Sequence, residues 1–196
     1  MAHKALEVEL RDARANPSFR DEARNLHPLR TIPVLVEEDG SAIGDSGAIT
    51  RYLDATYAGP RIWPESATDA RDIFHVASLV DGALDNLINA GTRFFPLRND
   101  PAWAGVKAEI VGRGQDALDA LGRHVASLGR STIGQIGWSG ADMWLVTMVL
   151  WLEGLPARAP TYAPAAQIVD LGFSIPPALT AWVDRHRQRA DVRALG

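Results

Sequence analysis

The first third of the chain carries short segments in which apolar and polar residues alternate. Residues 6–10 (LEVEL) place apolar side chains between charged ones, which predicts a half-exposed strand. Residues 31–36 (TIPVLV) predict a second strand and residues 41–44 a third. Asp39-Gly40 stands between these last two segments and favours a tight reversal, so we expect them to form an antiparallel hairpin.

Two helices accompany these strands. Asn16 is placed to cap the first helix, and Pro17 suits its first turn. The second helix is expected from Ser46 to Tyr57. Its apolar residues recur at the spacing of one helix face and are Ile49, Tyr52, Leu53 and Tyr57. The order in this part is therefore strand, helix, hairpin, helix.

The rest of the chain predicts helices only. Ser66 and Asp69 form a capping pattern in front of one long amphipathic segment. Asp100-Pro101 begins another, and Gly129 ends it. The apolar stripes are Ile73, Val76, Val80, Leu84 and Leu87 in the first, and Val106, Ile110, Leu118, Leu121, Val125 and Leu128 in the second.

The most apolar segment of the chain is Met143–Leu152. Nine of its ten residues are apolar, and a helix that is apolar on every side belongs at the centre of a bundle. Ser139 and Asp142 form a second capping pattern at its start. Beyond this segment a loop is expected around three prolines, at positions 156, 160 and 164.

A change of pattern divides the chain into two domains. Glycine and proline residues cluster at residues 59–66, which predicts a linker there. Residues 1–58 are expected to form a mixed α/β domain, and residues 67–196 an all-helical domain whose last helix starts near Pro177.

Composition narrows the classes of function. The 196-residue chain is 46% hydrophobic and 22% charged, which is typical of a globular protein. Its net charge is −4 and no basic run stands out, so neither nucleic acid nor a membrane is an expected partner. There is no cysteine, which excludes disulfides and a cysteine nucleophile. The five histidines lack metal-ligand spacing, so no metal site is expected. The N-terminal residues lack the apolar core of a signal peptide, so we expect a cytoplasmic location.

Pro33 lies inside a segment that otherwise reads as a strand, and two explanations are open. Proline has no N–H group and can stand at the edge of a sheet. Alternatively, the Ile32–Pro33 bond is cis, which an X–Pro bond accepts at a cost of about 0.5–1 kcal/mol. A cis bond would turn the backbone of Ile32 outward, where it could pair with a peptide ligand as an extra strand would. The nearby Asp45 and Ser46 favour this second explanation.

Asp45 and Ser46 stand at the predicted N-terminus of a helix. Such an end offers free N–H groups and a partial positive charge, which suit a carboxylate. Ser46 can add its hydroxyl, and Asp45 can meet an ammonium group. Both residues can cap the helix as well. Together with the backbone of Ile32, this helix start would hold a short peptide that has an amino-acid head.

These segments resemble the glutathione transferase family. The stretch "TIPVLVEEDGSAIGDSGAITRYL" is similar to the glutathione-binding segment of that family, with its cis-proline and its acidic-Ser helix start. "NLHPLRTIP" resembles the approach to the cis-proline, and "WSGADMWL" resembles the capping box of the buried central helix. The likeness spans nearly the whole chain. It implies a thioredoxin-like N-terminal domain followed by an all-helical C-terminal domain.

The resemblance also implies the roles of individual residues. The main chain of Ile32, before Pro33, would hold the cysteinyl part of glutathione, Ser46 the γ-glutamyl carboxylate, and Asp45 the amine. Thr31 stands where many members carry a longer polar residue near the glycyl end. The implied activity is the conjugation of glutathione, as co-substrate, to a small hydrophobic electrophile by a cytoplasmic homodimer that serves detoxification.

The family begins with a strand and a helix that would precede this sequence. We therefore expect a thioredoxin-like domain that lacks its first strand and most of its first helix. Three explanations are open: the start codon is misassigned, the sequence is a fragment, or the protein is a reduced variant of the fold. The Ser, Cys or Tyr that activates the glutathione thiol would lie upstream of Met1, so no catalytic residue is assigned. A non-catalytic binding or interaction module of the same fold is the alternative.

Overall fold

The computed structural model describes residues 4, 6–13, 15–28 and 30–193. The chain divides into two compact units, Met1–Trp63 and Pro64–Gly196. The division falls between residues that the sequence placed in a linker.

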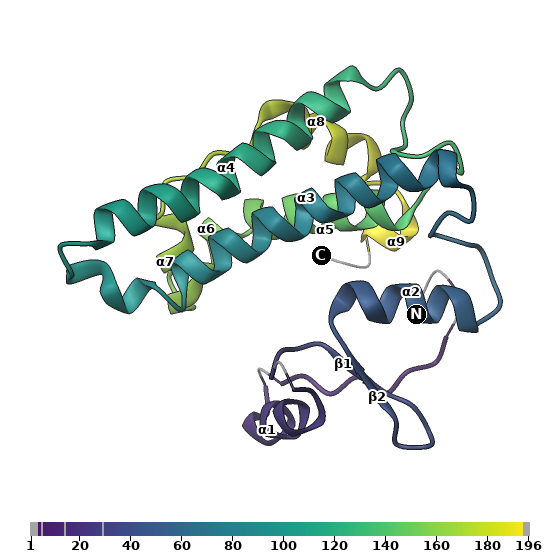
Figure 1. The fold of residues 1–196 in the computed structure, drawn as a ribbon, viewed down its shortest axis with the longest axis horizontal. Helices are drawn as coiled ribbons and strands as arrows, with labels where there is room; N and C mark the ends of the chain where they lie inside the picture. The colour runs from purple at the N-terminus through teal and green to yellow at the C-terminus, as the bar shows by residue number, and fades with distance from the viewer. Residues whose placement is uncertain (1–3, 5, 14, 29, 194–196) are drawn as a thin grey trace. The chain divides into compact units, whose positions relative to one another are not determined.

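The first unit combines a small sheet with two helices (Figure 1). Its elements are α1 (Pro17–Leu26), β1 (Val34–Val36), β2 (Ala42–Gly44) and α2 (Ser46–Thr56). The predicted cap of α1 is confirmed, because the side chain of Asn16 accepts a hydrogen bond from the amide of Ser18. On α2, Ile49 and Leu53 are buried.

The two strands form the predicted antiparallel hairpin. Val34 pairs with Gly44, and Val36 pairs with Ala42. Gly40 has a φ of +83° in the turn, a conformation that glycine adopts without steric cost. β1 is shorter than expected, since residues 31–33 precede it and lie outside the ladder.

The predicted strand at residues 6–10 is wrong. These residues adopt no strand, and the sheet formed by the described part of the chain has two strands. The side chain of Leu10 is 89% exposed, and that of Val8 is 45% exposed. A strand depends on backbone pairing with a neighbour, and no described segment pairs with this one. The alternation of apolar and charged residues was therefore not sufficient to predict a strand at residues 6–10.

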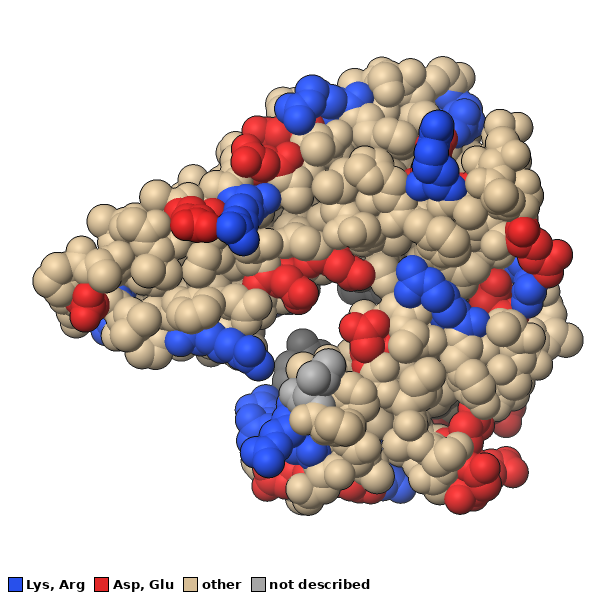
Figure 2. Space-filling model, viewed as in Figure 1, with Lys and Arg blue, Asp and Glu red and all other residues tan. Residues whose placement is uncertain are grey.

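The second unit is helical. Its elements are α3 (Ala67–Gly91), the 3₁₀ helix η2 (Phe95–Asn99), α4 (Trp103–Ser127), α5 (Gly140–Glu153), α6 (Leu155–Arg158), α7 (Ala163–Val169), α8 (Pro177–His186) and α9 (Ala190–Arg193). Figure 1 shows α3 and α4 side by side, joined through η2. Along the face seen in Figure 2, basic and acidic side chains are interspersed over these two helices.

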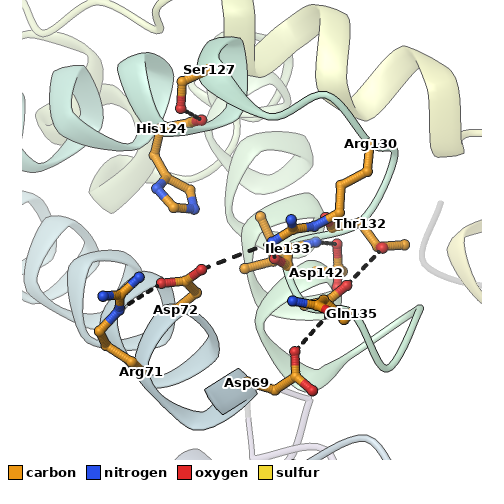
Figure 3. A network of polar contacts seen from close by, with 11 residues as sticks. Asp69, Arg71, Asp72, His124, Ser127, Arg130, Thr132, Ile133, Gln135 and Asp142 are labelled. Atoms are coloured by element: carbon orange, nitrogen blue, oxygen red, sulfur yellow. Dashed lines mark hydrogen bonds and ion pairs between the residues drawn. The ribbon is translucent and has the colours of Figure 1, made fainter.

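The apolar helix α5 supplies much of the core of this unit, as predicted. Ala141, Leu145, Val146 and Val149 have no exposed surface, and α5 contacts α3 and α8. At its start, the carboxylate of Asp142 accepts hydrogen bonds from the amides of Ser139 and Ile133, both at 2.9 Å (Figure 3). The side chain of Ser139 accepts from the amide of Asp142 in turn, which completes the predicted capping box.

Two predictions in this unit needed correction. The helix expected from Asp100-Pro101 begins at Trp103, because the carboxylate of Asp100 bonds the amide of Ala102 and closes a turn before the helix starts. The loop expected around three prolines contains α6 and α7, in which proline occupies the first turn. A proline is compatible with that position because its missing N–H would have no partner there anyway.

Candidate functional site

The Ile32–Pro33 peptide bond is cis, which confirms the second of the two explanations offered for Pro33. Pro33 directly precedes β1 and lies outside it. The Ile32 side chain is 49% exposed. Neither the N–H nor the C=O of Ile32 is hydrogen-bonded within the described part of the chain. Both groups are thus available to an external peptide.

Asp45 is the N-cap of α2 and Ser46 its first residue, as predicted. One carboxylate oxygen of Asp45 accepts hydrogen bonds from the amides of Gly47 (2.8 Å) and Ala48 (3.1 Å). The backbone of Asp45 has a φ of +75°, which is unusual for a residue other than glycine. Ser46 is exposed, and its hydroxyl has no partner among the described residues.

The hairpin register brings these four residues to one end of the sheet. Because Val34 pairs with Gly44, the residues just before β1 and just after β2 leave the ladder at the same end. Ile32 and Pro33 therefore emerge beside Asp45 and Ser46. A backbone segment with free N–H and C=O groups and a helix N-terminus therefore lie at the same end of the sheet.

Gly44 permits a close contact behind this end of the hairpin. A Cβ atom at Gly44 would lie 2.4 Å from ring atoms of His27, well inside the distance that real Cβ contacts show. The glycine thus lets the His27 ring pack against the strand. His27 is the C-cap of α1, so this contact ties the segment that leads to Ile32 onto the sheet.

Asp54 anchors the other end of α2, and the sequence analysis missed it. Its side chain is almost fully buried, with 3% exposed, and it accepts hydrogen bonds from the amides of Ile62 (3.0 Å) and Trp63 (3.1 Å). Lys4, also buried, lies 3.3 Å from the same carboxylate. The only signal in the sequence was an acidic residue directly after the apolar Leu53. The carboxylate fixes α2, and with it the helix start that bears Ser46.

Two tyrosines of the first unit are directed at one carboxylate. The hydroxyl of Tyr57 donates to Glu37 at 2.8 Å. The hydrogen bond to Glu37 raises the pKa of both Tyr52 and Tyr57. Their hydroxyl groups are thereby occupied within the unit and harder to ionise.

Arg30 is a second residue that sequence reasoning missed. Its backbone has a φ of +54°, and its amide donates to the carbonyl of His27 at 2.9 Å. The side chain is exposed and has no hydrogen-bond or ion-pair partner among the described residues. No sequence signal pointed to it, because a left-handed backbone favours glycine or asparagine.

No group of three or more His, Asp or Glu residues in the described ranges could hold a metal ion. No helix in these ranges is long and apolar enough to span a membrane.

The sequence matches a family model in its first unit. Residues 1–61 match the model of the glutathione S-transferase N-terminal domain. A glutathione S-transferase of Arabidopsis thaliana is 42% identical over 67 residues. That match covers 33% of this chain and 29% of the length of the plant protein.

The fold matches solved structures over far more of the chain. A glutathione S-transferase from Methylobacillus flagellatus with glutathione bound is 22% identical, with a TM-score of 0.74 over 100% of this chain and 89% of that one. Glutathione S-transferase 1-6 from Anopheles dirus is also 22% identical, with a TM-score of 0.64 over 95% of this chain and 79% of that one.

A maleylacetoacetate isomerase from Methylobacterium extorquens with bound malonate and glutathione has a TM-score of 0.65 at 18% identity, over 95% of this chain and 82% of that one. The architecture shared with these proteins is a thioredoxin-like N-terminal part followed by a helical part. The first unit therefore matches a glutathione S-transferase N-terminal domain in sequence, and the chain along its length has the glutathione transferase fold.

Proposed function

We propose that this chain binds glutathione at the end of the hairpin and conjugates it to a hydrophobic electrophile. The observation that carries the proposal is the meeting of a free backbone edge at Ile32 with the exposed helix start at Asp45 and Ser46. The first suits the cysteinyl part of the tripeptide through main-chain hydrogen bonds. The second suits the γ-glutamyl carboxylate, through the Ser46 hydroxyl and the helix N-terminus.

The proposed reaction is a nucleophilic attack by the glutathione thiolate. The sulfur forms a bond to an electrophilic carbon, the thiol proton is given up, and the leaving group departs where the substrate carries one. Ile32, Pro33, Asp45 and Ser46 hold and orient the tripeptide, which raises the effective concentration of the sulfur beside the electrophile. The residue that lowers the thiol pKa remains unassigned. Tyr52 and Tyr57 are poor candidates because Glu37 occupies both hydroxyls.

Calorimetric titration of the full chain with glutathione tests the binding proposal. Replacing Ser46 by Ala removes one hydrogen bond to a carboxylate and should weaken glutathione binding about ten- to a hundredfold, since such bonds contribute about 1.5–3 kcal/mol. Ser41→Ala is the matched control, because Ser41 is exposed on the same unit near the turn of the hairpin. Absence of heat at millimolar glutathione, or equal affinity for both variants, would contradict the assignment.

A non-catalytic binding module is the second candidate. The observation in its favour is that Glu37 engages the hydroxyls of Tyr52 in α2 and of Tyr57 directly after it, so neither is free to stabilise a thiolate. The two candidates differ in turnover. Conjugation of glutathione to a general aryl halide by the full chain supports the transferase, whereas saturable glutathione binding without turnover supports the module.

Assembly and location belong to the same proposal. We expect a homodimer in a cytoplasmic, detoxifying role, which suits a chain without cysteines that uses a thiol co-substrate. Light scattering of the purified chain measures the oligomeric state directly. A monomeric mass across the micromolar range would contradict the dimer.

A further inference from the structure

The segment that carries Ile32 is closed on a single glycine. Val34, at one end of the segment, is the ladder partner of Gly44. His27, at the other end, packs its ring where a Cβ atom of Gly44 would stand. Both ends of the segment therefore meet the sheet at Gly44, and the next residue after this glycine is Asp45, the cap of α2.

The contact between His27 and Gly44 holds an end of the segment that has little else to hold it. The preceding helix α1 contributes no buried residue, so it has no apolar face packed in a core. His27 is the C-cap of α1, and its carbonyl accepts a hydrogen bond from the amide of Arg30 at 2.9 Å. Only a residue without a Cβ atom leaves room for the ring, so His27 and Gly44 form a matched pair.

The His27 ring contributes to this contact through its shape. Its Nδ1 atom is buried and has no hydrogen-bond partner among the described residues. A buried polar atom without a partner is a cost to folding, so Nδ1 does not explain why a ring stands here. What remains is a flat ring packed on a glycine. A flat ring without the nitrogen should therefore serve as well.

Glutathione would contact the chain on both sides of this pair. In the proposed site it binds the backbone of Ile32 within the closed segment and the hydroxyl of Ser46 two residues after Gly44. A ligand held at two points binds more tightly when those points are already fixed relative to each other. We propose that His27 is a positioning residue of the glutathione site, whose ring, packed on Gly44, fixes the free N–H and C=O groups of Ile32 relative to Ser46. This inference rests on the proposed function.

The experiment compares a ligand that contacts both points with one that contacts a single point. L-Glutamine has the α-carboxylate, the ammonium group and the γ-amide of the γ-glutamyl head, and it lacks the other two residues of glutathione. Each ligand is titrated into the full chain, with binding followed by NMR at the amide of Ser46. The variants are His27→Ala, His27→Phe, Gly44→Ala and the double variant His27→Ala/Gly44→Ala. Arg20→Ala is the matched control, because Arg20 is exposed on α1.

His27→Ala should bind glutathione about five- to tenfold more weakly than wild type, because the ligand must then order the segment itself. Its affinity for glutamine should be unchanged. His27→Phe and Arg20→Ala should keep the wild-type affinity for both ligands.

Gly44→Ala should lower the thermal unfolding temperature, because its methyl group meets the ring. Removing the ring as well should recover part of that loss. The double variant should also bind glutathione no more weakly than His27→Ala, since the two residues act through one contact.

Four results overturn the inference, and they are distinguishable. Wild-type affinity for glutathione in His27→Ala shows that the ring does not position the site. An equal loss of affinity for glutathione and glutamine in His27→Ala shows a structural role only. A loss in His27→Phe as large as in His27→Ala shows that a ring nitrogen matters and the shape does not. Failure of wild type to bind glutathione removes the proposed function itself, and this inference with it.

Discussion

At the scale of the residue, the candidate site depends on backbone conformations that side chains rarely adopt. Asp45 and Arg30 both have a positive φ, yet the two positions differ in what holds them. The Asp45 side chain accepts two amide hydrogen bonds, which offset the cost of its conformation. No comparable contact is made by the side chain of Arg30 within the described residues. Its conformation is therefore a cost to folding, of about 1 kcal/mol.

Replacing Arg30 by Gly should stabilise the chain. Glycine adopts a positive φ without steric cost, so we expect the free energy of unfolding to rise by about 0.5–1 kcal/mol. Urea denaturation measures this change. Arg20→Gly is the control, because Arg20 lies within α1 and glycine there should lower stability by about 1 kcal/mol. A less stable Arg30→Gly variant would show that the arginine side chain has a structural role.

At the scale of the element, helix caps could be predicted from the sequence and strand pairing could not. Asn16, Ser66 and Ser139 each bond an amide within three residues, so the information is local. The alternation at residues 6–10 indicated a strand, but a strand also needs a partner elsewhere in the chain, and the local pattern carries no such information. The short helices α6 and α7 were missed because their prolines were read as breakers.

In the candidate site too, local features could be predicted from the sequence and contacts between distant residues could not. The helix start at Asp45 was predictable because a cap is a local feature. The backbone conformation of Arg30 was not, because Arg30 is bonded to His27, whose ring packs against Gly44, 17 residues away in sequence (44 − 27). Asp54 was missed for a similar reason, since the amides it binds belong to residues 62 and 63.

Asp54 also supports a prediction about how α2 is held. Asp54→Ala would leave the amides of Ile62 and Trp63 without their acceptor. It would also leave the ammonium of Lys4, which donates to the carbonyl of Tyr57 as well, without its counter-charge. Removing one member of a buried charged cluster costs about 3–5 kcal/mol, so unfolding of the first unit should shift to markedly lower urea concentration. Asp54→Asn keeps one oxygen acceptor and should fall between that variant and wild type. Asp39→Ala removes an exposed carboxylate that bonds a single amide, and it should cost about 1 kcal/mol or less. If Asp54→Ala lowered the stability of the first unit no more than Asp39→Ala does, the anchoring role of Asp54 would be refuted.

At the scale of the whole molecule, a buried and a half-buried histidine of the helical unit link stability to pH. His186 is 6% exposed and lies between the rings of Trp138 and Trp182, at centroid distances of 4.9 and 5.3 Å. Burial lowers its pKa, with the nearby Asp142 acting in the opposite direction. Burial likewise lowers the pKa of His124, whose side chain projects from α4 toward α3 (Figure 3). Burial therefore favours the neutral form of both histidines.

The sign of the pH dependence follows from these directions. A histidine whose folded pKa lies below the unfolded value of about 6.5 binds fewer protons in the folded state, so stability rises with pH between those two values. Its full contribution is present above about pH 6.5 and is lost as the pH falls toward the folded pKa. Each histidine can add a slope of up to about 1.4 kcal/mol per pH unit in that window. The pKa of Asp142 is raised by burial, and its own transition falls between pH 3.8 and its raised value.

Urea unfolding between pH 7.5 and 5 checks this dependence. The free energy of unfolding of wild type should be flat above about pH 7 and should fall below pH 6.5. In His186→Phe the fall should be shallower, whatever the absolute stability of that variant, because the ring that must remain neutral is gone. His75→Gln is a control, since His75 is an exposed histidine on α3. An equal slope in wild type and in His186→Phe would show that the packing of His186 between the two tryptophans tolerates the imidazolium. The acid sensitivity of the helical unit would then have to originate at His124 or in its carboxylates.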